Sequence, residues 1–233
     1  MPRRSGNSAS GLGQPLTTFS LRRLLIGLLS MAAVPVGAAA APLRFEAVFR
    51  AAGEPASLHY RATFRSGGGA HRLEVWRDGD RRIKRVTDGA VETYVMHRPG
   101  DDNFQMQALD LRKRINTHID RTTMYRMGNF TDWFDLGHGV RMPKGVYQLT
   151  QTAAPAVATK PLADCDWYTL TQGARRTQLC WDPSNRLPLL IVSGGLTIWQ
   201  ITAIDRTPFK PSVFEINDKG FVRVDAVRDT ERD

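Results

Sequence analysis

The sequence predicts a mainly β protein, a curved antiparallel sheet of about ten strands with a helical insertion over one face. Three observations carry this prediction. Polar and apolar residues alternate over many short segments, as in half-buried strands. Glycine-containing turns such as "SGGGA" and "DGA" separate these segments, which is typical of a meander. One interval, 116–136, loses the alternation and takes helical spacing instead. A sheet this wide tends to curl, and the helix would cover its concave face.

The expected strands follow one another along residues 41–233, which we expect to form a single domain. They are 43–51, 58–66, 71–79, 80–89, 91–99 and 103–111, and, after the insertion, 186–195, 196–205, 212–216 and 221–227. In the insertion at 116–136, apolar and long side chains recur near helical spacing, from Ile115 and Ile119 to Phe130 and Trp133. The Pro-broken, small-residue stretch 152–163 predicts a connector.

Residues 1–40 have the order of an export signal: basic residues, an uncharged apolar stretch and a run of small residues. We expect cleavage near Ala40, because Pro42 directly after the cut would be unfavourable, and therefore a periplasmic location. The alternatives are a membrane anchor and, since "FSLRRLLIG" resembles a twin-arginine signal, a route other than Sec. The net charge of +9 includes four arginines within this acid-free stretch, so the remaining body is only mildly basic and predicts no nucleic-acid partner.

The chain contains two cysteines, Cys165 and Cys180, in a predicted hairpin at 164–182. A turn at 171–174 or at 172–173 would place them directly opposite each other, within disulfide reach. In an exported protein such a pair is typically a structural disulfide. The same register predicts one face for the core, with Tyr168, Leu170, Leu179 and Trp181, and another with Trp167, Arg176, Gln178 and the disulfide.

Catalytic and metal-binding patterns are hard to find in the sequence. Ser193 lacks the G-x-S-x-G elbow, and the five histidines form no H-x-H or H-x-x-x-H motif, so we expect no metal, no cofactor and no enzyme activity. The exception that stays open is a hydrolase using Asp132, Asp135 or His138.

The stretch "LCWDPSNRLPLLIV" resembles the strand pair with a W-D-x-x-x-x-L-P-L corner of periplasmic lipoprotein-localisation carriers, whose fold is shared by periplasmic regulators of the envelope-stress sigma factor. "RRIKRVTDGAVETYVMHRP" is similar to the basic strand, Asp-Gly turn and aromatic strand of those proteins. The resemblance extends in pattern over 44–205, and it implies an unclosed half-barrel with a helical lid over an apolar concave face. The cysteine hairpin, the connector and the C-terminal segment depart from the family pattern.

These observations predict an exported, non-enzymatic binding protein that holds an apolar ligand in a curved sheet. The ligand would be a lipid or lipoprotein acyl chain, or an apolar segment of a partner. The expected lining residues are Trp76, Tyr94, Met96, Phe104, Met106 and Trp199, and the expected basic rim is Arg81, Arg82, Lys84 and Arg85. The alternatives are that these apolar residues form a sealed core, and that the protein is an envelope accessory or sensor acting through another envelope protein. The basic clusters 81–85 and 111–114 would also suit an anionic membrane surface.

Overall fold

A computed structural model describes residues 42–97, 103–120, 122–123, 132–156 and 158–226 of the 233-residue chain. The chain divides at Ala40, and all described residues belong to the second unit, Ala41–Asp233. The expected export signal, its cleavage site and residues 121 and 124–131 of the expected helical insertion lie outside the described residues.

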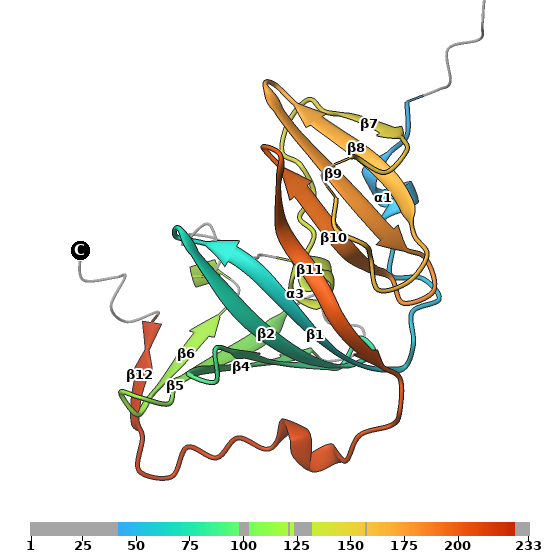
Figure 1. Cartoon of the computed structure of the whole chain (residues 1–233). Coiled ribbons are helices and arrows are strands. Elements are labelled where there is room, and N and C mark those ends of the chain that lie inside the picture. The colour runs from blue at the N-terminus through green and yellow to red at the C-terminus, as the bar shows by residue number, and fades with distance from the viewer. Residues whose placement is uncertain (1–41, 98–102, 121, 124–131, 157, 227–233) are drawn as a thin grey trace, which may run out of the picture. The chain divides into compact units, whose positions relative to one another are not determined.

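The second unit is built on a 12-stranded sheet with the order β12-β6-β5-β4-β3-β2-β1-β11-β10-β9-β8-β7 (Figure 1). The strands are β1 (Ser57–Ser66), β2 (Gly69–Asp78), β3 (Arg82–Thr87), β4 (Val91–His97), β5 (Phe104–Asp110), β6 (Ile115–Asp120), β7 (Gln148–Gln151), β8 (Asp166–Gln172), β9 (Arg175–Asp182), β10 (Leu187–Ser193), β11 (Leu196–Asp205) and β12 (Val222–Asp225). Neighbouring strands are antiparallel except for the β12–β6 pair. The prediction of a mainly β, curved, open sheet is therefore confirmed, with twelve strands instead of about ten.

The glycine-containing turns predicted at 66–70 and 88–90 connect strands of the sheet. Asp88 and Gly89 separate β3 from β4 with φ angles of 53° and 63°. Two successive left-handed residues give a turn whose twist matches that of the flanking strands, which is why Asp-Gly is a strong hairpin signal. The β1–β2 turn at 67–68 follows the same logic with two glycines.

The helical prediction for 116–136 is wrong in its first part. Residues Ile115–Asp120 form strand β6, which pairs with β5 and with β12. A spacing of four residues, as between Ile115 and Ile119, is shared by one helical face and by one strand face, so it could not separate the two. Further along the expected insertion, Trp133–His138 form helix α3, as predicted.

The strands expected at 43–51 and 212–216 are also corrected. Residues Phe45–Val48 form the short helix α1, in which Phe45 and Phe49 lie one turn apart with ring centroids 4.7 Å from each other. Both rings are buried, and Phe49 also packs edge-on against Trp181. Residues Pro211–Phe214 form the 3-10 helix η1, which places Phe214 under the guanidinium of Arg82.

The core lies on the face of the sheet that α1 and α3 cover. Leu58 and Tyr60 of β1, Val75 of β2 and Ile83 of β3 are almost fully buried there, and strand β10 is buried along nearly its whole length. On the other face, the segment after β11 crosses β3 through η1 before it reaches β12 (Figure 1). The sheet thus has a helix-covered face and a face crossed by the C-terminal segment.

The disulfide Cys165–Cys180 is present, with a Cα–Cα distance of 5.4 Å. The predicted direct opposition is wrong by two residues, because the turn is Gly173–Ala174 and Cys180 lies opposite Trp167. A shift of two residues keeps every side chain on its predicted face. The core face of this hairpin therefore still carries Tyr168, Leu170, Leu179 and Trp181, as expected from the sequence.

Candidate functional site

The candidate site begins where helix α3 ends. Gly139 follows the helix in the left-handed conformation, with φ of 69°, and its backbone N–H donates to the carbonyl oxygen of Asp135. This is the usual way in which glycine ends a helix. The position is closed to any larger residue, since a Cβ there would lie 3.0 Å from Cη2 of Trp199. The chain therefore turns over the Trp199 indole and runs along the ends of strands β8 to β11.

A groove of about 440 Å³ lies between residues 139–144 and these strand ends. Its walls are mainly apolar, and its cations are on the side of 139–144 and at the start of β9. The apolar side chains of its lining include Val140, Met142, Leu170, Leu179, Ile191 and Ile198. Binding sites for small molecules typically measure about 300–1,000 Å³ and combine apolar walls with few polar groups. The groove fits that description at its smaller end.

A buried polar cluster fixes the end of α3 and hence one wall of the groove. Nη1 of Arg77 donates to the carbonyl oxygen of Gly137 at 3.0 Å, and Nη2 faces Oε2 of Glu54 at 3.3 Å. Nη2 also donates to the carbonyl oxygen of Asn185 in the β9–β10 turn, at 3.2 Å. Four elements far apart in the sequence thus meet at one guanidinium. Burial lowers the pKa of Arg77, while the nearby Glu54 charge opposes that shift.

His138 belongs to the same cluster. Its Nε2 lies 2.9 Å from Oε2 of Glu54, and its Nδ1 lies 2.8 Å from the carbonyl oxygen of Phe134. The imidazole is fully buried, and burial lowers its pKa against the opposing hydrogen bond with Glu54. With both ring nitrogens occupied and no exposure, His138 acts as a structural tie between α3 and Glu54.

The polar rim of the groove starts with an ion pair. Nε of Arg141 lies 3.6 Å from Oδ2 of Asp135, a carboxyl that is 3% exposed. Burial and the nearby Asp132 charge raise the pKa of Asp135 to about 6, against the opposing effect of Arg141. Further along the rim, the side-chain amide of Gln172 donates to the carbonyl oxygen of Lys144. This contact joins residues 139–144 to the end of β8.

The structure divides the six expected lining residues between the two faces of the sheet. Met106 lies opposite Val95, so it shares the helix-covered face, and Phe104 packs there against Trp133 at 6.1 Å. Trp199 also lies on that face, beneath Gly139. By contrast, Trp76, Tyr94 and Met96 lie on the face crossed by the C-terminal segment. No single surface brings the six together.

The expected basic rim is also divided. Arg81 and Arg82 both pair with Asp78, with N–O distances of 2.6 and 2.5 Å. Lys84 lies over the rings of Trp76 and Tyr94, at 5.6 and 5.0 Å from their centroids. Arg85, one residue further along the strand, takes the opposite face, where its charge acts on Tyr60. None of these four cations lines the groove.

The carboxylates considered for hydrolysis lie at α3, but they do not form an acid–base pair around an open cleft. Asp132 is exposed at the start of the helix, and Asp135 is buried beside Arg141. In the part of the chain that the structure describes, no group of three or more His, Cys, Asp or Glu side chains could hold a metal ion.

Sequence reasoning missed the stretch "GVRMPK" at 139–144, which forms one wall of the groove. The available signal was a methionine and two cations in a proline-containing stretch without an acidic residue. Nothing in the sequence shows that this stretch lies against strands β8 to β11.

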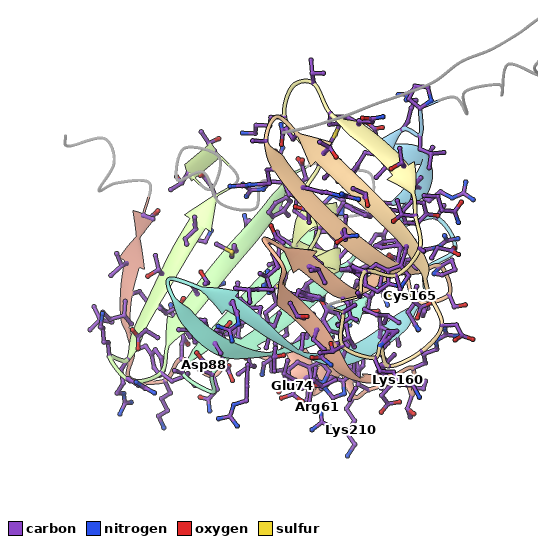
Figure 2. All side chains as sticks on the ribbon, turned by 45° about the horizontal axis from the view of Figure 1, so that its top comes forward. Arg61, Glu74, Asp88, Lys160, Cys165 and Lys210 are labelled. Atoms are coloured by element: carbon purple, nitrogen blue, oxygen red, sulfur yellow. A yellow bond between two sulfur atoms is a disulfide. The ribbon has the colours of Figure 1, made fainter. Side chains whose placement is uncertain are left out.

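A second hollow of about 440 Å³ lies on β1, β2 and the β3–β4 turn. Figure 2 labels three of its residues, Arg61, Glu74 and Asp88. Arg61 and Glu74 lie opposite each other in the β1–β2 ladder, and Asp88 holds His71 at 2.7 Å. Charged side chains of both signs line this hollow, so it lacks the single-sign rim of the groove.

No family model matches the chain, and no curated protein matches it. Among solved structures, it is similar to PNGF-II in two crystal forms, P21 and C2, with a TM-score of 0.30 and 8% identity in each. The matches cover 76% and 72% of this chain and 32% and 30% of the other, so this chain spans about a third of PNGF-II. Similarity at this level assigns neither a fold family nor a function. Within the described residues, no helix is long and apolar enough to cross a membrane.

Proposed function

We propose that this protein is an exported, non-enzymatic binding protein, and that it holds the apolar part of an amphiphile in the groove between residues 139–144 and strands β8 to β11. The observation that carries the proposal is the groove itself, with about 440 Å³ between mainly apolar walls. Apolar surface removed from water there supplies binding free energy without any catalytic group.

The rim favours an amphiphile with an anionic head. Arg141, Lys144 and Arg175 border the groove, and Asp135 offsets part of the Arg141 charge. A carboxylate or phosphate head group at the rim would meet cations, while its acyl chain lies against the apolar walls. A fatty acyl chain of a lipid or lipoprotein fits this combination. An apolar ligand held against the sheet also agrees with the binding mode that the resemblance to lipoprotein-localisation carriers implies.

Native mass spectrometry of protein purified from the envelope of an exporting host tests this function. We expect a bound amphiphile that dissociates at higher collision energy, and an N-terminus near Ala40 or Ala41. A mass equal to the bare chain, in a sample that also fails to take up added fatty acid, would contradict the binding function. It would favour the accessory or sensor alternative. A retained Met1 would contradict cleavage while leaving the groove as it is.

A further inference from the structure

Three connecting segments meet at one end of the sheet, beside the groove. They are residues 139–147, the β8–β9 turn at 173–174 and the β10–β11 turn at 194–195. The strand register brings them together, because Ser193 lies opposite Thr177 and Gln148 lies opposite Thr171. Figure 1 shows the turns of both hairpins at the same end of their strands. We call this surface, formed by 139–147, 172–177 and 193–197, the basic end.

The basic end carries charge of a single sign. It contains Arg141, Lys144, Arg175 and Arg176, and its three segments contain no aspartate or glutamate. All four cations are exposed. One of them, Arg141, also faces the carboxyl of Asp135. Cations on segments that contain no acidic residue raise the local concentration of anionic partners.

The same surface exposes large apolar side chains at the tips of its segments. Val146 is 93% exposed, Leu196 is 60% exposed and Met142 is 44% exposed. Met142 and Val146 lie on the segment before β7, with Lys144 between them, and Leu196 is the first residue of β11. Exposed apolar side chains that share one end of a sheet with a group of cations suit a partner that is both anionic and apolar.

We propose that the basic end docks on the surface of a bilayer that contains anionic phospholipid. Single apolar side chains that protrude between cations suit the interface of a bilayer, where each can enter the acyl boundary while its basic neighbours meet head groups. An acidic protein surface would satisfy the charge, but it would leave Val146 and Leu196 without an apolar environment. The combination of charge and protruding apolar tips therefore favours lipid.

The docking surface shares Arg141, Met142, Lys144 and Arg175 with the groove, but other residues of the basic end lie outside it. Val146, Arg176 and Leu196 belong to the basic end and do not line the groove. Substitutions at these residues therefore separate a failure of docking from a failure of ligand binding.

Sedimentation with vesicles tests the proposal. We expect the protein to bind vesicles of phosphatidylglycerol mixed with phosphatidylcholine, to bind pure phosphatidylcholine much less, and to dissociate as salt is added. Arg176→Glu should weaken partitioning by about tenfold or more, because reversing one charge removes the attraction of one cation and adds a repulsion. Val146→Ser with Leu196→Ser should weaken it by about tenfold through the loss of buried apolar area.

Matched controls come from the connector between β7 and β8, at the opposite end of these strands. Lys160 is exposed there, as labelled in Figure 2, and Leu162 is 48% exposed. Lys160→Glu and Leu162→Ser repeat the chemical changes and should leave vesicle binding unchanged. Equal loss in the controls, or equal binding to neutral and anionic vesicles, would overturn the proposal. Binding to polyglutamate without binding to any vesicle would also overturn it, in favour of an acidic protein partner.

Discussion

Gly139 passes directly over the indole of Trp199, so close that a Cβ on residue 139 would lie 3.0 Å from Cη2 of the ring. With φ of 69° at the same residue, the backbone conformation and the available space both require glycine. This contact sends the chain from the end of α3 across strands β8 to β11, and it therefore sets one wall of the groove.

Gly139→Ala should lower the free energy of unfolding by about 2–4 kcal/mol, from left-handed strain together with overpacking against Trp199. Gly173→Ala is the matched control, because Gly173 also has a positive φ, of 56°, but has open space where the Cβ would lie. We expect the control to cost about 1 kcal/mol. Urea unfolding measures both values, and equal losses would show that the Trp199 contact contributes nothing.

Removal of the disulfide should lower the stability of the protein under oxidising conditions and leave it unchanged under reducing conditions. The bridge joins residues 15 positions apart. A loop of this size stabilises the folded state by about 3 kcal/mol through the lost freedom of the unfolded chain. We therefore expect Cys165→Ser to unfold at lower urea concentration than the oxidised wild type. In the presence of dithiothreitol the two proteins should unfold alike, and a difference that persists there would mean that the serine itself is responsible.

Replacing Arg77 alone should destabilise the protein more than replacing Arg77 and Glu54 together. Arg77→Met leaves Glu54 with only His138 to compensate it, and breaking a buried pair in this way costs about 3–5 kcal/mol. The double variant Arg77→Met with Glu54→Gln removes the unpaired charge, so we expect it to be more stable than Arg77→Met alone. If the loss of unfolding free energy in the double variant equals the sum of the losses in the two single variants, Arg77 and Glu54 are not coupled.

The buried carboxyl of Asp135 should make stability fall as pH rises. Its folded pKa is raised to about 6, above its value in the unfolded chain, so the folded state holds the proton more tightly. The stabilisation from that proton is complete below the unfolded pKa near 4 and is lost as the pH rises through about 6. Asp135→Asn should therefore match the wild type at about pH 4 and exceed it by about 1–2 kcal/mol at about pH 7. The same stability difference at both pH values would contradict the raised pKa.

The sequence predicted the elements that depend on local pattern. Alternation and Asp-Gly turns located most strands, and the hairpin faces survived a two-residue error in register because side chains alternate with a period of two. The alternation of side chains within a strand does not show which residues of two different strands share a face. Whether Tyr94 shares a face with Met106 depends on the turn between their strands, and the register places them on opposite faces.

The groove could not be predicted because it depends on contacts between distant residues. Arg77 holds the carbonyl of Gly137 across a separation of 60 residues, and Trp199 lies beneath Gly139 across a similar separation. Phe45 and Phe49 were misassigned to a strand for a more local reason. A spacing of four residues places both side chains on one face of a helix, and equally on one face of a strand. In the helix that forms, Phe45 packs on Phe49, and Phe49 packs on Trp181, which is distant in the sequence.

The most direct test of the proposed binding function is a titration with a fluorescent fatty acid, using two matched variants. Ile198 is half-buried in the groove, whereas Val222 is an exposed apolar residue on β12, far along the sheet. We expect the wild type and Val222→Glu to bind saturably with the same affinity. Ile198→Glu should bind at least about tenfold more weakly, because its carboxylate would be desolvated by the acyl chain, while circular dichroism shows an intact fold. Equal affinity in all three folded proteins, or no saturable binding by the wild type, would contradict the groove as the ligand site.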